Sequence, residues 1–97
     1  MEWLLIGATK YTPQIILDAL KALLEMRGKS YPENTFKFYQ PVLSWIERYF
    51  QDPLPDTLFQ MEIIYFNSSS SKLFFDLFDL LETYREKSHI TIEWICD

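Results

Sequence analysis

The sequence is poor in the residue types from which most catalytic and metal sites are built. It has a single histidine, His89, and a single cysteine, Cys96, which are too few for a zinc-type ligand set. One cysteine also excludes an internal disulfide. The two glycines, Gly7 and Gly28, lie far apart, so they cannot form a glycine-rich phosphate-binding loop. We therefore predict no catalytic residue, no metal site and no cofactor.

The remaining ionisable side chains have simpler interpretations than acid–base catalysis. Asp76, Asp79 and Glu86 are spaced along one face of a predicted helix, which is typical of a solvated face rather than of a paired acid and base. His89 stands just before the last predicted strand, where a surface position is a better interpretation than a general base.

Long apolar runs and clusters of basic residues are also missing. No apolar run reaches the roughly 18 residues of a membrane span, and the N-terminus lacks the basic region and apolar stretch of a signal peptide. The net charge of −5 argues against nucleic acid, because phosphate backbones are bound by basic patches. A single cysteine suits a reducing compartment. We expect a cytoplasmic protein with no nucleic-acid partner and no membrane insertion.

What the sequence has in quantity is apolar and aromatic residues, at 48% and 18% of the chain. That content argues against disorder and is enough for a core, so we expect one small domain over residues 1–97. Hydrophobic periodicity predicts strands at residues 3–6, 58–66 and 90–95 and helices at residues 35–50 and 73–84. Pro41 should kink the first helix or mark its true start. Alternating strands and helices imply an α/β fold with a mixed sheet.

Residues 13–27 fit two structures. Thr12 could cap a helix that has Pro13 at its first position and Gly28 after its end, and local rules alone favour this helix. The competing interpretation is a β-hairpin of residues 14–17 and 22–27 that turns at residues 18–21. That turn contains neither Gly nor Asn, so its hairpin signal is weak.

Four consecutive serines at residues 68–71, between Asn67 and Lys72, connect the strongest strand signal to the strongest helix signal. Helix capping is the simpler and favoured interpretation of this stretch, because a serine oxygen accepts from the unpaired amides of a first turn. The other interpretation is a phosphorylation switch. A helix N-terminus favours an anion, Lys72 adds a positive charge, and a phosphoryl group would bring about −1.5 to −2 charges.

One aromatic side chain stands out on the second predicted helix. Phe75 projects to the acidic side of that helix, near Asp79 and Glu82, within a turn or two of the serines. Exposed single aromatics are ordinary. An apolar anchor beside a residue whose charge can change would nevertheless suit the docking of a partner.

The polar junction Ser-Tyr-Pro-Glu-Asn at residues 30–34 is a second candidate surface. Its structural interpretation is that Pro32 and Asn34 set up the start of a helix while Tyr31 packs. A turn and a cap require neither Glu33 nor an aromatic residue, so the structural and the binding interpretations have about equal support.

The segment at residues 24–34, Leu-Glu-Met-Arg-Gly-Lys-Ser-Tyr-Pro-Glu-Asn, is followed by Phe-Tyr-Gln-Pro-Val-Leu-Ser-Trp-Ile at residues 38–46. Together they resemble the signature of the SiaC-family bacterial regulatory phosphoproteins. The runs at residues 65–72 and 78–82 resemble the second block of that family, and the match covers nearly the whole chain. The resemblance implies a STAS-like fold, with a mixed sheet flanked by two main helices in the order β-β-β-α-β-α-β. It also implies that residues 14–27 form a β-hairpin, and we follow it there.

The resemblance further implies a switch protein that is not an enzyme. Members bind and stimulate a diguanylate cyclase of the GGDEF type, which raises cyclic di-GMP and favours biofilm formation. A dedicated protein kinase phosphorylates the switch and a PP2C-type phosphatase restores it. The family's phosphoacceptor follows the Asn of the second block. It is Ser68 here, where the family has threonine, and Ser69 and Ser70 are adjacent alternatives. The resemblance also predicts an acidic extension after Asp97.

These considerations give one predicted set of partner-binding residues, drawn from both junctions and the second helix. An alternative function is a STAS-type anti-sigma-factor antagonist in another partner-switching system. Co-purification of a GGDEF cyclase or of an ATP-binding anti-sigma factor would distinguish the two. The predicted partner-binding residues are Tyr31, Glu33, Asn34, Asn67, Ser69, Ser70, Lys72 and Phe75.

Overall fold

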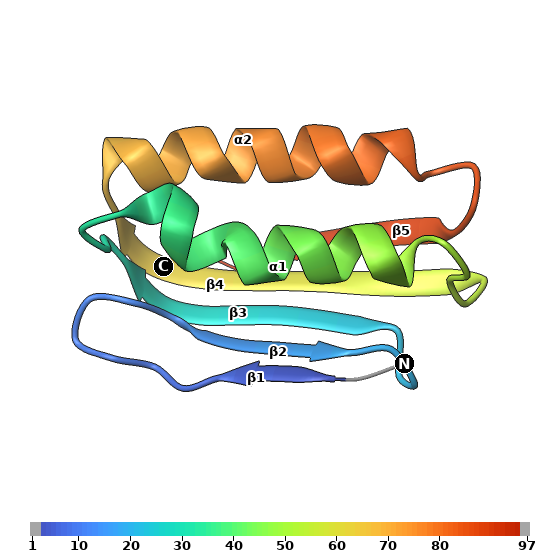
Figure 1. Cartoon of the computed structure of the whole chain (residues 1–97), viewed down its shortest axis with the longest axis horizontal. Helices are drawn as coiled ribbons and strands as arrows, with labels where there is room; N and C mark the ends of the chain where they lie inside the picture. Colours follow the sequence, from blue (N-terminus) through green and yellow to red (C-terminus); the bar gives the residue numbers. More distant parts are fainter. Residues whose placement is uncertain (1–2, 96–97) are drawn as a thin grey trace.

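The computed structural model describes residues 3–95 as a five-stranded sheet with two helices (Figure 1). The strands lie side by side in their order along the chain. The first two pairings are antiparallel, and β3–β4 and β4–β5 are parallel. This confirms the predicted mixed sheet and the order β-β-β-α-β-α-β. The elements are β1 (Leu4–Ile6), β2 (Gln14–Asp18), β3 (Leu23–Ser30), α1 (Thr35–Tyr49), β4 (Asp56–Phe66), α2 (Ser68–Thr83) and β5 (His89–Trp94).

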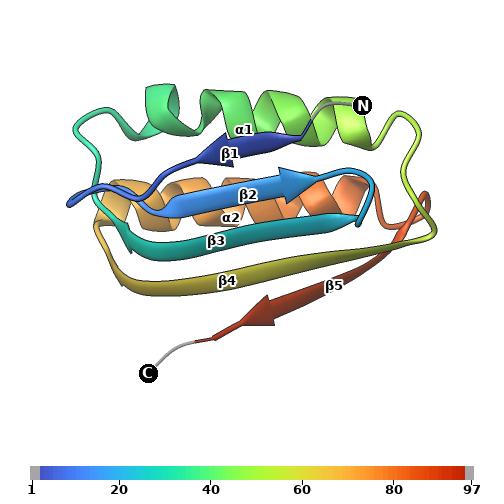
Figure 2. The ribbon, with the colours of Figure 1, turned by 90° about the horizontal axis from the view of Figure 1, so that it is seen from below.

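Both helices cover the same face of the sheet (Figures 1 and 2). Helix α1 connects β3 to β4, and α2 connects β4 to β5, so the two crossovers proceed in one direction across the sheet. Crossovers of the same hand that proceed in one direction place their helices on one side. The core therefore lies between this face and the helices. The opposite face has polar side chains: Arg27 forms ion pairs with Glu25 of the same strand and with Glu62 of β4. Gln60 of β4 donates a hydrogen bond to Glu93 of β5.

The β2–β3 hairpin confirms the interpretation drawn from the resemblance and overturns the helix that local rules favour. The carboxylate of Asp18 accepts hydrogen bonds from the amides of Leu20 and Lys21, at 3.0 and 3.2 Å. Ala22 then closes the turn with a positive φ of 52°. A side-chain-capped turn of this kind replaces the Asn-Gly pair that usually signals a hairpin.

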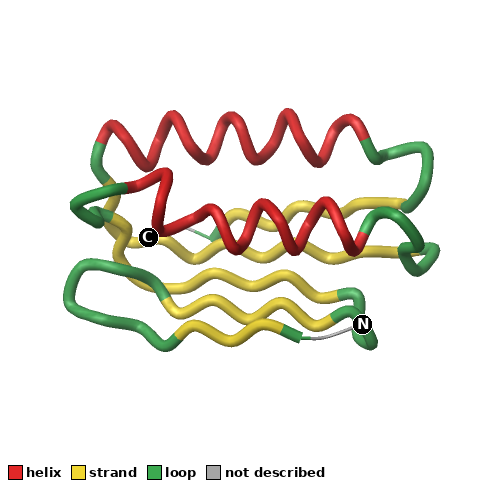
Figure 3. The backbone as a smooth tube through the Cα atoms, viewed as in Figure 1, coloured by secondary structure: helices red, strands yellow, loops and turns green. Residues whose placement is uncertain are grey.

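Helix α1 begins at Thr35, as predicted, and ends at Tyr49, one residue before its predicted end. It contains Pro41, so of the two predicted roles of this proline the marking of the helix start is wrong. Figure 3 shows the first turn of α1 offset from the rest of the helix. Helix α2 begins at Ser68 rather than at residue 73, so the serines form its first turn. Its cap is Asn67, not a serine.

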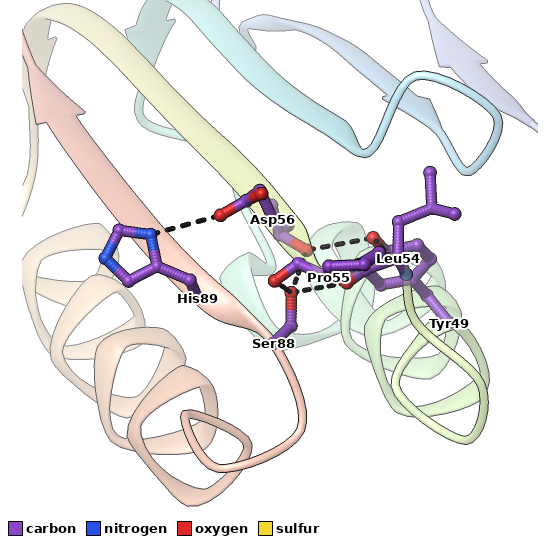
Figure 4. Close-up of polar contacts among 7 residues, drawn as sticks. Tyr49, Leu54, Pro55, Asp56, Ser88 and His89 are labelled. Carbon is purple, nitrogen blue, oxygen red and sulfur yellow. Dashed lines mark hydrogen bonds and ion pairs between the residues drawn. The ribbon is translucent and has the colours of Figure 1, made fainter.

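The end of the sheet where β4 and β5 begin is closed by buried hydroxyl groups (Figure 4). The Thr57 hydroxyl lies 2.9 Å from the hydroxyl of Tyr49 and 2.7 Å from that of Ser88, and the Ser88 hydroxyl donates to the Leu54 carbonyl. His89 lies outside this network, exposed, with its Nδ1 atom 3.3 Å from the Asp56 carboxylate. This arrangement agrees with a surface histidine at a strand entry.

Neither helix within residues 3–95 has the length and hydrophobicity needed to cross a membrane. Cys96 lies outside the described residues.

Candidate functional site

The carboxyl ends of β3 and β4 bring the two predicted junctions together. Because these strands are parallel and adjacent, the segments that follow them start at the same edge of the sheet. The Asn67 amide donates to the Ser30 carbonyl over 3.1 Å and ties the junctions directly. Strand β4 has one extra residue beside Gly28, whose φ is +123°. The resulting register shift pairs Ser30 with Phe66 on the helix-covered face.

An asparagine caps each helix at this edge. The side-chain oxygen of Asn34 accepts from the Lys37 amide over 3.0 Å, and that of Asn67 accepts from the Ser70 amide over 2.8 Å. Both asparagines have extended backbone angles, as N-cap residues do. Two helix N-termini, with their unpaired amides and the positive ends of their dipoles, therefore open at the same end of the sheet.

The four serines have different environments. Ser68 and Ser69 are exposed, and Ser71 is half-buried. Ser70 is fully buried, with its hydroxyl 2.8 Å from that of Ser30, so it does not belong to the exposed surface that the sequence prediction assumed. Of the three candidate acceptors, only Ser68 and Ser69 are accessible in the folded chain.

A buried network supports this first turn from below. The Ser30 hydroxyl lies between those of Ser70 and Tyr39, at 2.8 and 2.5 Å, and all three residues are fully buried. Burial disfavours the phenolate and raises the pKa of Tyr39 to about 12, although the hydrogen bond with Ser30 opposes the shift. The network thus joins β3, α1 and α2 through neutral hydroxyl groups.

Tyr39 should make the protein lose stability at high pH. Its pKa rises from 10.0 in the unfolded chain to about 12 on folding, so its contribution is complete below pH 10 and is lost as the pH rises through 12. The full loss is about 2–3 kcal/mol, from roughly 1.4 kcal/mol per pKa unit. Urea unfolding across this range should show a shallower decline for Tyr39→Phe than for the parent. Tyr11→Phe, which removes an exposed phenol, is the control, and equal declines in all three proteins would contradict the assignment.

A groove of about 360 Å³ separates the first turns of the two helices. Lys72 lies in it and is exposed, and among residues 3–95 it forms no ion pair. The groove therefore combines one unpaired cation with two carboxylates and exposed apolar surface from Phe36. Its lining residues are Glu33, Asn34, Thr35, Phe36, Ser69, Lys72, Leu73 and Asp76.

Tyr31 belongs to an aromatic cluster on the other side of Glu33. Its ring packs edge-to-face against Tyr11 and Tyr65, with centroids 5.2 and 5.1 Å away. Tyr31 and Glu33 also line a wider groove of about 680 Å³ with Tyr11 and residues 9, 12, 32 and 38. Tyr31 therefore packs against neighbouring rings, as its structural interpretation predicts, while Glu33 is exposed between the two grooves.

Phe75 is 66% exposed, as the sequence predicts, but it does not line either groove. It lies seven residues after Ser68 on α2, a spacing that puts both side chains on one helix face. The predicted partner-binding residues therefore do not form one surface: Ser70 is buried and Tyr31 lines the wider groove. Ser69, Lys72, Glu33 and Asn34 face the groove, whereas Phe75 shares a face with Ser68.

Sequence reasoning missed the buried role of Ser70 and the contribution of Phe36. The signal for Ser70 was present: it precedes Leu73, Phe74 and Leu77 by three, four and seven residues, which is the spacing of the buried stripe of α2. It could be recognised only by extending the helix back to Ser68. Among residues 3–95, no group of acidic, histidine or cysteine side chains could hold a metal ion.

Comparison with known proteins agrees with this geometry. The family described as SiaC family regulatory phosphoproteins matches residues 6–97. The chain belongs to the SiaC family. The resemblance seen in the sequence is thereby confirmed over almost the whole chain.

Three relatives from Pseudomonas aeruginosa are informative. An uncharacterised protein of strain UCBPP-PA14 is 34% identical over 98 residues, covering all of this chain and 78% of that protein. The solved structure of SiaC is 34% identical, covers 97% of this chain and 78% of that one, and superposes with a TM-score of 0.90. The third is a crystal structure of the diguanylate cyclase SiaD in complex with its activator SiaC. It is 26% identical, covers 97% of this chain and 99% of the matched chain, and gives a TM-score of 0.79.

Proposed function

We propose that this chain is a non-enzymatic switch that binds and stimulates a diguanylate cyclase of the GGDEF type, and that phosphorylation of Ser68 releases the cyclase. The observation that carries the proposal is the match, over 97% of this chain, to a structure described as a cyclase in complex with its activator SiaC. The family description as regulatory phosphoproteins supports control by phosphorylation. The switch would act in the cytoplasm and raise cyclic di-GMP.

Ser68 is the proposed phosphoacceptor because of its position and its exposure. It is the first residue of α2 and directly follows the cap residue Asn67. A kinase can reach its hydroxyl without opening the fold, whereas the Ser70 hydroxyl is enclosed by its contact with Ser30. Ser69 is also accessible, but it faces the groove against α1.

The first turn of α2 can hold a phosphoryl group once it is attached. Free amides at the helix N-terminus and the helix dipole favour the anion. Lys72, which forms no ion pair with the other described residues, lies about one turn after Ser68. The unmodified Ser68 side chain instead carries no charge, and its helix face includes the exposed ring of Phe75. A phosphoryl group would place about −1.5 to −2 charges in any contact made there, which disrupts an apolar interface.

A reversible switch requires one enzyme that adds the phosphoryl group and one that removes it. We propose that a dedicated protein kinase and a PP2C-type phosphatase act on Ser68. The network of Ser30, Tyr39 and Ser70 would keep the first turn of α2 folded in both states. In this mechanism the modification changes the charge of the surface and leaves the fold intact.

The proposal is tested by mixing the purified chain with the GGDEF cyclase from its own host and measuring cyclic di-GMP formation from GTP. We expect saturable stimulation and a stable complex on size exclusion. Glu33→Ala, in the groove, and Phe75→Ala, on the Ser68 face, report which surface the cyclase contacts. An unstimulated cyclase, with an ATP-binding anti-sigma factor co-purifying instead, would overturn the proposal.

A further inference from the structure

Within residues 3–95, strand β5 forms an edge of the sheet, and Glu93 is its one acidic side chain (Figure 2). Natural edge strands are blocked by charged side chains, especially Lys, by Pro, by bulges, by a covering segment or by being very short. The sequence of β5, His-Ile-Thr-Ile-Glu-Trp, contains neither Lys nor Pro, and its register with β4 is continuous. The opposite edge, β1, is only three residues long. The outer side of β5 is therefore a template for another strand.

The hydrogen bonds of β5 show which of its amides point outward. The amides of His89 and Ile95 donate to the Pro55 and Met61 carbonyls, both over 2.7 Å, so the odd-numbered residues of this segment face β4. Alternate residues of a strand direct their backbone groups to opposite sides. The N–H and C=O groups of the even-numbered residues, 90, 92 and 94, are consequently directed to the free edge.

The side chains of those same residues are apolar and lie on the helix-covered face. Ile92 lines a shallow groove with Phe78 of α2, and the Trp94 ring lies 5.8 Å from that of Phe78. Ile92 is 44% exposed and Trp94 is 40% exposed, while Ile90 packs against the core. The free backbone groups and the exposed apolar surface thus belong to the same residues.

We propose that β5 pairs antiparallel with β5 of a second copy of this chain, with the two-fold axis at Ile92. In this register Ile92 lies opposite Ile92 of the second copy, and Ile90 lies opposite Trp94, so each of these apolar side chains meets another. On the open face, Thr91 lies opposite Glu93. All outward amides then have partners, and the two five-stranded sheets become one continuous sheet.

The chemistry of β5 favours this register over its neighbours. Centring the pair on Glu93 would place two carboxylates directly opposite each other, and like charges at that position are destabilising. Centring it on Thr91 would leave Trp94 beyond the end of the other strand. Only the axis at Ile92 pairs every apolar residue of β5, which is why a second copy suits this edge. The contact is a single strand with its flanking side chains, so we expect reversible, concentration-dependent association.

Sedimentation velocity over a range of concentrations tests the association with two matched lysine variants. Ile92→Lys should weaken dimerisation at least about 10-fold, because it places two like charges across the axis at a cost of about 1.4 kcal/mol or more. Thr91→Lys adds the same charge to the same strand but puts it opposite Glu93, so it should preserve or tighten the dimer. Circular dichroism melting verifies that both variants fold. A parent protein that stays monomeric throughout would overturn the proposal.

Disulfide trapping tests the register itself. In a Cys96→Ser background, Ile92→Cys places each thiol directly opposite the same thiol of the second copy. The Cα atoms of a hydrogen-bonded antiparallel pair lie about 5.5 Å apart, which is also a usual separation for a disulfide. We expect covalent dimers in mild oxidant from Ile92→Cys and far fewer from Thr91→Cys. Preferential cross-linking of Thr91→Cys, or equal cross-linking of both, would overturn the axis at Ile92.

Discussion

Replacing Ser68 by aspartate should abolish the complex with the cyclase while leaving the fold intact. Burying an added carboxylate costs about 2–5 kcal/mol when the binding partner offers no cation to pair with it, so the dissociation constant should rise about 30-fold or more. Enzymatically phosphorylated protein carries more charge and should bind still more weakly. Isothermal titration calorimetry or biolayer interferometry with the purified cyclase measures both.

The charge of the new side chain can be separated from its size. Ser68→Asn has the shape of Ser68→Asp without the charge, and it should bind within a few-fold of the parent protein. Ser44→Asp adds a carboxylate at an exposed position of α1 and controls for net charge. Comparable affinities for Ser68→Asp, Ser68→Asn and the phosphorylated protein would contradict the switch. If Ser68→Asn also loses binding, the loss would be due to the shape of the new side chain rather than to its charge.

The elements that the sequence predicts well have their signals in local patterns. The apolar stripe of α2 and the alternation that begins β4 can be seen within single windows of sequence. In the structure, the apolar residues of both patterns pack between the sheet and the helices. Pro41 had two predicted roles, a kink or the true start of the helix, and the offset first turn corresponds to the kink. It lies at an exposed position inside α1, where a missing N–H and an offset first turn are tolerated.

The β2–β3 hairpin could not be predicted from local patterns, because its stability comes from neighbours distant in sequence. β2 pairs with β1, and β3 pairs in parallel with β4 across an intervening helix. Asp18 and Ala22 make the turn possible, yet neither is a strong hairpin residue by itself. Tertiary pairing here overrides a helical preference, as it commonly does.

The two junctions could be located from the sequence, but which serines are exposed and which is buried could not. Whether Asn67 or a serine caps α2 decides which hydroxyl points inward, and both residue types are good caps. Once Asn67 is the cap, helical geometry turns Ser70 toward the core, where Ser30 from the end of β3 meets it. The second half of that contact lies 40 residues away in sequence, beyond any local rule.

Replacing Ser70 by aspartate should therefore have the opposite outcome to Ser68→Asp. Ser70 is fully buried, and its hydroxyl neighbours, Ser30 and Tyr39, are neutral, so a carboxylate there would have no cation to pair with. An uncompensated buried charge costs about 3–5 kcal/mol, and each kcal/mol lowers the Tm of a domain this size by about 4–8 °C. Thermal and urea unfolding should show a large loss of stability for Ser70→Asp.

Two comparisons identify charge burial as the cause. Ser70→Ala removes the same hydrogen bond without adding a charge and should cost only about 1 kcal/mol. Ser68→Asp adds the same charge at the exposed start of the helix, where the dipole favours it, and should leave stability unchanged or raise it by about 0.3–1 kcal/mol. Because burial raises the pKa of a carboxyl group, the deficit of Ser70→Asp should shrink as the pH falls and the group becomes neutral. A deficit that is the same at every pH, or equal to that of Ser70→Ala, would mean that the first turn of α2 opens to solvent, and that Ser70 is as accessible to a kinase as Ser68.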